Sequence, residues 1–165
     1  MATKNKVFDP LAVARTKPAS VKALEINPAG ARNAGLGVLE PYPRFPVEIL
    51  ACKNLTKLAI FRGIAWGGDQ TIPKAIGSLG KLTHLTLGGL GFEKLPAELG
   101  RLTKLVDLDL VYSNAVTELP ASLGKLTRLQ RLSCGYCEAL VKLPSTIGNL
   151  KELRELALGR TALRG

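Results

Sequence analysis

The only histidine, His84, and the two aspartates Asp107 and Asp109 are the residues whose chemistry most resembles an acid-base site. Imidazole titrates near neutral pH, and a carboxylate can orient it. However, the repeat pattern places no serine or cysteine nucleophile beside His84, and an open sheet does not exclude water as catalysis usually requires. We therefore expect a surface histidine, no catalytic residue and no enzyme activity.

Two of the three cysteines, Cys134 and Cys137, form a C-x-x-C pair, a spacing found in redox and metal sites. No second pair exists, and His84 lies two repeats away. Cys134 and Cys52 each stand where other repeats carry a core leucine, and free cysteine packs as a small apolar group. The sequence therefore predicts no metal ion and no cofactor.

The elements that position these residues come from a short sequence motif that occurs five times along the chain. We call each copy of this motif a phrase. Its prolines are Pro46, Pro73, Pro96, Pro120 and Pro144, spaced 27, 23, 24 and 24 residues apart. A repeat this short holds one strand and one return segment, and it cannot bury its own apolar face. Neighbouring repeats must stack to bury a continuous core, so the pattern predicts a solenoid.

A second phrase, Leu-x-x-Leu-x-Leu, follows each restart at a fixed offset and supplies the strands. In Leu105, Leu108 and Leu110, for example, the last two leucines are two residues apart and so point to one face of a strand. After each proline the apolar spacing changes to three, which fits a short helical or 3₁₀ return segment. Strands that recur with the same spacing and hand should pair in parallel.

These phrases resemble the leucine-rich repeat family, in the variant L-x-x-L-x-L-x-x-C/N-x-x-L-x-x-L-P-x-x-I/L-G-x-L. The resemblance covers residues 45–165 directly, and residues 21–26 fit a degenerate earlier strand. It implies an α/β horseshoe with about six parallel strands on the concave face and short helical or 3₁₀ segments on the convex side. In plant immune receptors and bacterial repeat proteins such repeats serve as platforms for partner proteins.

The domain organisation follows from the same phase. Residues 1–20 are expected to form an N-terminal cap with a short helix, in which Asp9 is the N-cap and Pro10 the first helical residue. Residues 21–165 form the repeat domain, with a degenerate repeat over 21–44 and regular repeats over 45–165. The glycine-rich loop around Trp66 is either a local plug or an interface anchor.

The repeat phase also identifies side chains on the concave sheet face, where we expect a partner protein to bind. The candidate binding residues are Lys57, Phe61, His84, Asp107, Asp109, Tyr112, Arg131, Tyr136 and Glu155. Exposed tyrosine and arginine are typical anchors of protein interfaces. The structural alternative is that Asp107, Arg131 and Glu155 simply form a charge ladder of small energetic value.

The net charge of +10 offers a different partner class. Lys81, Lys104 and Arg128 occupy equivalent positions in three return segments, and Arg101 and Lys125 share another, so together they form a basic stripe outside the sheet. This stripe favours either an anionic partner, such as nucleic acid or an acidic membrane, or a solvated ridge. Because no aromatic residues are interleaved for base stacking, the anionic partner is the less favoured interpretation.

The expected function is therefore a non-catalytic protein-protein interaction module. Two alternatives stay open: binding of nucleic acid or membrane by the basic stripe, and a fragment of a longer array without independent activity. The sequence stops just before the next proline and nothing resembling a cap follows, so either the last repeat is exposed, or two chains self-associate through the C-terminal repeat, or the chain is part of a longer array. Without a secretory stretch or a long apolar run, we expect a cytoplasmic protein, with export by another route left open.

Overall fold

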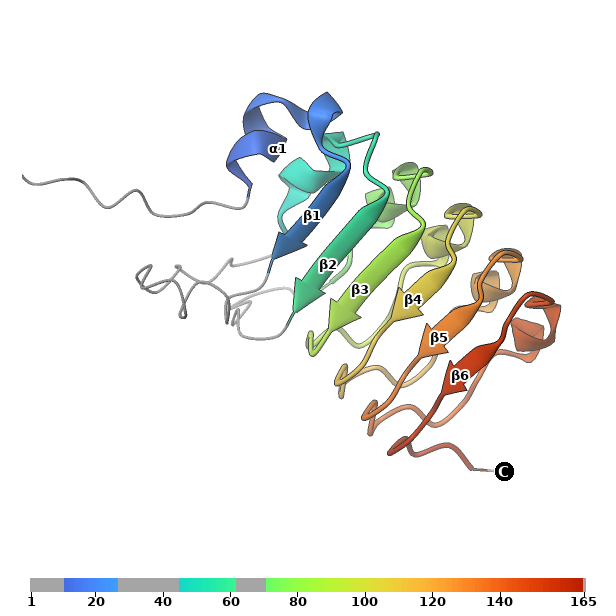
Figure 1. The fold of residues 1–165 in the computed structure, drawn as a ribbon. Coiled ribbons are helices and arrows are strands. Elements are labelled where there is room, and N and C mark those ends of the chain that lie inside the picture. Colours follow the sequence, from blue (N-terminus) through green and yellow to red (C-terminus); the bar gives the residue numbers. More distant parts are fainter. Residues whose placement is uncertain (1–10, 27–44, 62–70, 165) are drawn as a thin grey trace, which may run out of the picture.

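The computed structural model describes residues 11–26, 45–61 and 71–164, and these form one stack of repeats (Figure 1). Its strands are β1 (Ala23–Ile26), β2 (Lys57–Phe61), β3 (His84–Gly88), β4 (Asp107–Asp109), β5 (Arg131–Ser133) and β6 (Glu155–Ala157). They form one sheet in chain order, and every neighbouring pair is parallel. The expected solenoid of about six parallel strands is confirmed.

The return segments of the five regular repeats are 3₁₀ turns rather than α-helices. They span Val47–Ala51, Lys74–Ser78, Ala97–Arg101, Ala121–Lys125 and Ser145–Asn149. In each turn the proline of the phrase is the N-cap, as Pro96 shows with a φ of −69°. Its carbonyl accepts a 3.0 Å hydrogen bond from the Leu99 N–H, three residues on. This spacing defines the 3₁₀ geometry and ends the turn within five residues.

The hydrophobic core lies between the sheet and the 3₁₀ turns. The central leucines of β2 to β5 lie opposite one another in register and are at most 1% exposed: Leu58, Leu85, Leu108 and Leu132. Leu156, their equivalent in β6, is 41% exposed. Each internal leucine is thus covered by the repeats on both sides, whereas Leu156 has such a neighbour on one side among the described residues.

A short helix, α1 (Ala12–Thr16), and a 3₁₀ turn (Pro18–Ser20) lie at the β1 end of the stack (Figure 1). Among the described residues the helix begins at Ala12 with Leu11 as its N-cap, and the expected first helical residue, Pro10, lies outside them. Leu11 and Ala14 are both buried, so this segment packs against the core. Asp9, the degenerate residues 27–44 and the Trp66 loop lie outside the described residues. No helix in the described part of the chain has the length and apolar content that crossing a bilayer requires.

Glycines in the 3₁₀ turns allow neighbouring repeats to approach closely. A β-carbon built on Gly100 would lie 2.5 Å from the carbonyl oxygen of Ser122 in the next turn. Gly77 meets Glu98 at the same distance. Gly148, in the last described turn, has nothing within 4 Å of such a β-carbon. In the internal turns the glycine is therefore required by contact with the following repeat.

Side chains just beyond the strands satisfy backbone groups of the preceding repeat. The Ser113 hydroxyl donates to the Leu87 carbonyl at 2.9 Å, and the Cys137 thiol donates to the Leu110 carbonyl at 3.2 Å. Thr161 occupies the equivalent position after β6, but its hydroxyl donates within its own repeat, to the Leu158 carbonyl. The hydrogen bond to the preceding repeat is therefore made at Ser113 and Cys137 but not at Thr161.

Candidate binding face

The exposed side of the sheet, opposite the 3₁₀ turns, carries the predicted binding residues, and we call it the sheet face. One row runs in register across five strands: Lys57, His84, Asp107, Arg131 and Glu155. Asp109 lies in the adjacent row, opposite Thr86 and Ser133. Phe61 pairs with Gly88 at the end of β2, and its ring lies 3.6 Å from a β-carbon built on that glycine. The repeat phase thus placed these residues correctly, while their role in binding stays a prediction.

Arg131 joins three carboxylates into a charge cluster over β4 to β6. Its guanidinium lies 3.1 Å from Asp107, 3.4 Å from Asp109 and 3.2 Å from Glu155. Burial lowers the pKa of Arg131, but the hydrogen bonds to Asp107 and Glu155 and the charge of Asp109 outweigh it and raise the pKa above its ordinary value. The guanidinium therefore stays charged, and the charge ladder expected as the structural alternative is present.

The charge cluster should contribute a small but measurable coupling to stability. We expect Arg131→Met, Asp107→Asn and the double variant to give a coupling of about 0.5–1 kcal/mol in low salt, falling in 1 M salt. Urea unfolding of the four proteins measures it. The Lys94–Glu118 pair, 3.9 Å apart with side chains 71% and 60% exposed, is the matched control and should show almost none. Equal coupling in the two pairs would contradict this prediction.

Tyr112 and Tyr136 form a second feature, the tyrosine stack, at the carboxyl end of β4 and β5. Their ring centroids are 4.6 Å apart with an interplanar angle of 29°. The guanidinium carbon of Arg160 lies 5.2 Å from the Tyr136 centroid, so it covers one end of the stack. All three residues have positive φ, between 58° and 64°. Non-glycine residues rarely adopt this conformation, and such strain is concentrated at functional positions.

Arg160 also belongs to the tyrosine stack, although it is not among the binding residues predicted from the sequence. Its position in the repeat could have predicted this role, because Arg160 follows β6 at the position that Tyr112 and Tyr136 occupy after β4 and β5. Equivalent positions of stacked repeats lie about 4.8 Å apart, which is near the stacking distance of flat groups. Successive flat side chains at one position therefore predict a stack.

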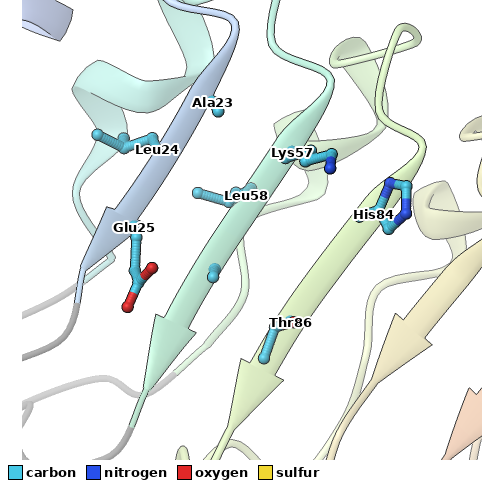
Figure 2. A pocket seen from close by; sticks show the side chains of 8 residues that line it. Ala23, Leu24, Glu25, Lys57, Leu58, His84 and Thr86 are labelled. Atoms are coloured by element: carbon cyan, nitrogen blue, oxygen red, sulfur yellow. The ribbon is translucent and has the colours of Figure 1, made fainter.

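A hollow of about 430 Å³ lies over β1 to β3, on the other half of the sheet face (Figure 2). Lys57, His84, Glu25 and Thr86 are among the residues that line it. His84 Nδ1 is 2.9 Å from the hydroxyl of its neighbour Thr83. Asp107 and Asp109, by contrast, contact Arg131. This hollow offers polar groups for binding but shows no arrangement of a nucleophile with a base.

Cys134 lies in the core, as the repeat phase predicted, and Cys137 is buried just beyond the same strand. Cys52, Cys134 and Cys137 are buried and free of disulfides. The hydrogen bond with Cys137, together with burial, raises the pKa of Cys134, and burial raises that of Cys52. In the described ranges, no three His, Cys, Asp or Glu side chains are grouped so that they could hold a metal ion. The cysteines therefore contribute packing and a turn hydrogen bond.

Comparisons with known structures reveal the same architecture in bacterial and plant proteins. The leucine-rich repeat protein LIC12759 of Leptospira interrogans is 30% identical, with a TM-score of 0.71 over 93% of this chain and 35% of its own. An internalin from Listeria monocytogenes is 21% identical, with a TM-score of 0.67 over 94% and 42%. The Arabidopsis receptor kinase HAESA, in complex with the peptide hormone IDA and the co-receptor SERK1, is 26% identical, with a TM-score of 0.55 over 72% and 20%.

The chain therefore spans less than half the length of each of these structures. A comparison with curated proteins gave no match. At the level of sequence families, the model described as a leucine-rich repeat region matches residues 51–163, which cover β2 to β6 and every 3₁₀ turn between them. On this match and on the observed fold, the chain belongs to the leucine-rich repeat family.

Proposed function

We propose that this protein is a non-catalytic binding module that holds a partner protein on its sheet face. The observation that carries the proposal is the tyrosine stack beside the charge cluster. Tyr112 and Tyr136 are 49% and 38% exposed, and the backbone of both residues has a positive φ. A turn that served packing alone would favour glycine there. Exposed rings held rigidly next to an arginine match the composition of interface anchors.

The structural relatives support the same class of function. HAESA was seen with a peptide hormone and a co-receptor, so a protein of related fold binds polypeptide partners. The long parallel sheet of the present chain likewise offers an extended surface rather than a deep, closed pocket. Such a surface suits a polypeptide better than a small substrate.

A second candidate function rests on the basic stripe. Its members are exposed on the side of the 3₁₀ turns: Lys81, Arg101, Lys104, Lys125 and Arg128. An anionic partner would bind there through charge, and the affinity would fall steeply with salt. The two candidates therefore use opposite sides of the stack, and variants can separate them.

The test is a pull-down from source-cell lysate at low and high salt with two double variants. In Tyr112→Asn/Tyr136→Asn the rings are lost, while asparagine tolerates the positive φ. In Lys104→Glu/Arg128→Glu the stripe is reversed in charge. We expect the tyrosine variant to lose the partner by roughly thirtyfold in affinity, as for interface hot spots, and the charge variant to retain it in high salt.

Circular dichroism must show that both variants keep the fold, and light scattering must separate partner capture from self-association. Recovery of nucleic acid or lipid that is lost with salt and with the charge reversals would instead establish the basic stripe as the binding site. A protein partner retained by the tyrosine variant would contradict the proposed role of the tyrosine stack.

A further inference from the structure

Four equivalent turn positions form one row along the carboxyl edge of the sheet, and we call this row the turn ladder. Its rungs are Gly89, Tyr112, Tyr136 and Arg160, with φ values of 69°, 64°, 59° and 58°. Backbone hydrogen bonds connect successive turns: Gly89 N–H donates to the Val111 carbonyl, and Tyr112 N–H to the Gly135 carbonyl. The four residues therefore share a similar backbone φ, and the rungs differ in the side chain that each residue carries.

The flat side chains of the turn ladder stack in order along this row. Tyr136 is covered on one face by Tyr112 and on the other by Arg160. Tyr112 has Tyr136 on one face, and among the described residues the next rung on its other side is that of Gly89. Glycine offers no side chain to that rung. Tyr112 is accordingly the more exposed ring of the pair. Among the residues that the structure describes, the stack of side chains therefore ends at Tyr112, one strand spacing of about 4.8 Å from the Gly89 rung.

The charge cluster beside the tyrosine stack favours a cation. Arg131 alone faces the three carboxylates of Asp107, Asp109 and Glu155, so the cluster carries a net charge of −2 within a chain of net charge +10. The face of a tyrosine ring also attracts a cation through its quadrupole.

The molecule itself indicates which cation fits a tyrosine face of this ladder. At the opposite end of the stack Arg160 places its guanidinium 5.2 Å from the Tyr136 centroid. A guanidinium is planar and stacks on aromatic rings, whereas an ammonium is a compact, strongly hydrated point charge. A neutral aromatic group would stack equally well on Tyr112 but would leave the surplus carboxylate charge uncompensated.

We propose that the Gly89 rung is a subsite for an arginine side chain of the partner protein, whose guanidinium stacks on the open face of Tyr112. The partner arginine extends the turn ladder by one rung, as Arg160 does at the other end. This inference rests on the proposed function and specifies the chemistry of the partner segment that lies across the sheet face.

The first experiment measures the subsite directly with a small probe. N-acetyl-arginine amide is titrated into the protein with ¹³C-labelled tyrosine rings, and N-acetyl-citrulline amide, which has nearly the same shape without the charge, is the comparison. We expect the Tyr112 ring signals to shift with a millimolar dissociation constant, and citrulline to bind at least about threefold more weakly. Equal shifts with both probes would overturn the assignment to arginine.

Two variants of Gly89 test the subsite and serve as controls for each other. Gly89→Arg supplies the guanidinium from within the chain, and Arg160 shows that arginine adopts the required φ at this position of the repeat. Gly89→Asn also suits positive φ, but its side chain is too short to cover the ring. We expect Gly89→Arg to abolish the arginine-induced shift and Gly89→Asn to retain it. Loss in both variants, or in neither, would overturn the subsite.

A selection from a random heptapeptide library then separates this inference from the proposed function. We expect peptides that need the tyrosine stack to be enriched in arginine on the wild type and to lose that enrichment on Gly89→Arg. Tyrosine-dependent peptides without arginine would overturn the subsite and keep the proposed function. A Tyr112 shift with the arginine probe but no tyrosine-dependent peptide would keep the subsite and contradict the proposed function.

Discussion

Replacing Gly100 with alanine should lower the free energy of unfolding by about 3 kcal/mol, because one methyl group has no room between two turns. The added β-carbon would lie 2.5 Å from the carbonyl oxygen of Ser122 and 2.8 Å from its β-carbon. A backbone carbonyl cannot rotate away as a flexible side chain can. The two neighbouring repeats must therefore separate locally, which weakens the core between them.

Gly148→Ala is the matched control, because the same substitution in the last described turn meets nothing within 4 Å. Its stability should stay unchanged or rise by up to about 1 kcal/mol, since alanine restricts the unfolded chain more than glycine does. Urea unfolding followed by circular dichroism measures both variants against the wild type. If Gly100→Ala were no less stable than Gly148→Ala, close approach between the turns would not explain the glycine of the phrase.

Replacing Leu108 with alanine should cost about 2–5 kcal/mol, as expected for a leucine enclosed on every side. Leu108 is 0% exposed and lies in register between Leu85 and Leu132. The substitution leaves a cavity that the stacked repeats on both sides cannot close without losing strand pairing. Truncation of this leucine should therefore destabilise the middle of the stack.

Leu156→Ala tests the same chemistry at the equivalent position of β6, where the leucine is 41% exposed. We expect the free energy of unfolding to fall by roughly 1 kcal/mol or less, because folding removes less of this side chain's apolar surface from water. Thermal unfolding of the two variants side by side gives the comparison. A loss for Leu156→Ala as large as that for Leu108→Ala would mean that a further contact covers β6 in solution, for example a second copy of the chain.

Much of the fold could be predicted from the sequence because one short phrase is repeated in phase. The spacing of two in Leu108 and Leu110 assigns the strand and its buried face, and the proline spacing assigns the turn. The register follows from the equivalence of the repeats alone, which places Asp107, Arg131 and Glu155 side by side, as the structure shows. The start of the N-terminal helix stays a prediction, because the expected N-cap Asp9 and the expected first helical residue Pro10 lie outside the described residues.

The candidate site could be predicted only in part, because repeat phase identifies positions but not side-chain geometry. It placed Tyr112 and Tyr136 at one turn position, yet their stacking and positive φ depend on the exact shape of the turn. It also could not show that Arg131 reaches three carboxylates at once, since this depends on rotamers. The repeat pattern therefore says least about the conformations of long, flexible side chains.

The constant register between repeats has a consequence for how such a chain can lengthen or shorten during evolution. Asp107, Arg131 and Glu155 are paired across neighbouring strands and lie 24 residues apart in sequence. Gene duplication or deletion of one 24-residue unit would leave every remaining contact between adjacent repeats intact, because each repeat touches only its neighbours. A single-residue insertion inside a strand would instead turn its core side chains outward. Natural variation in length is therefore expected in whole repeats.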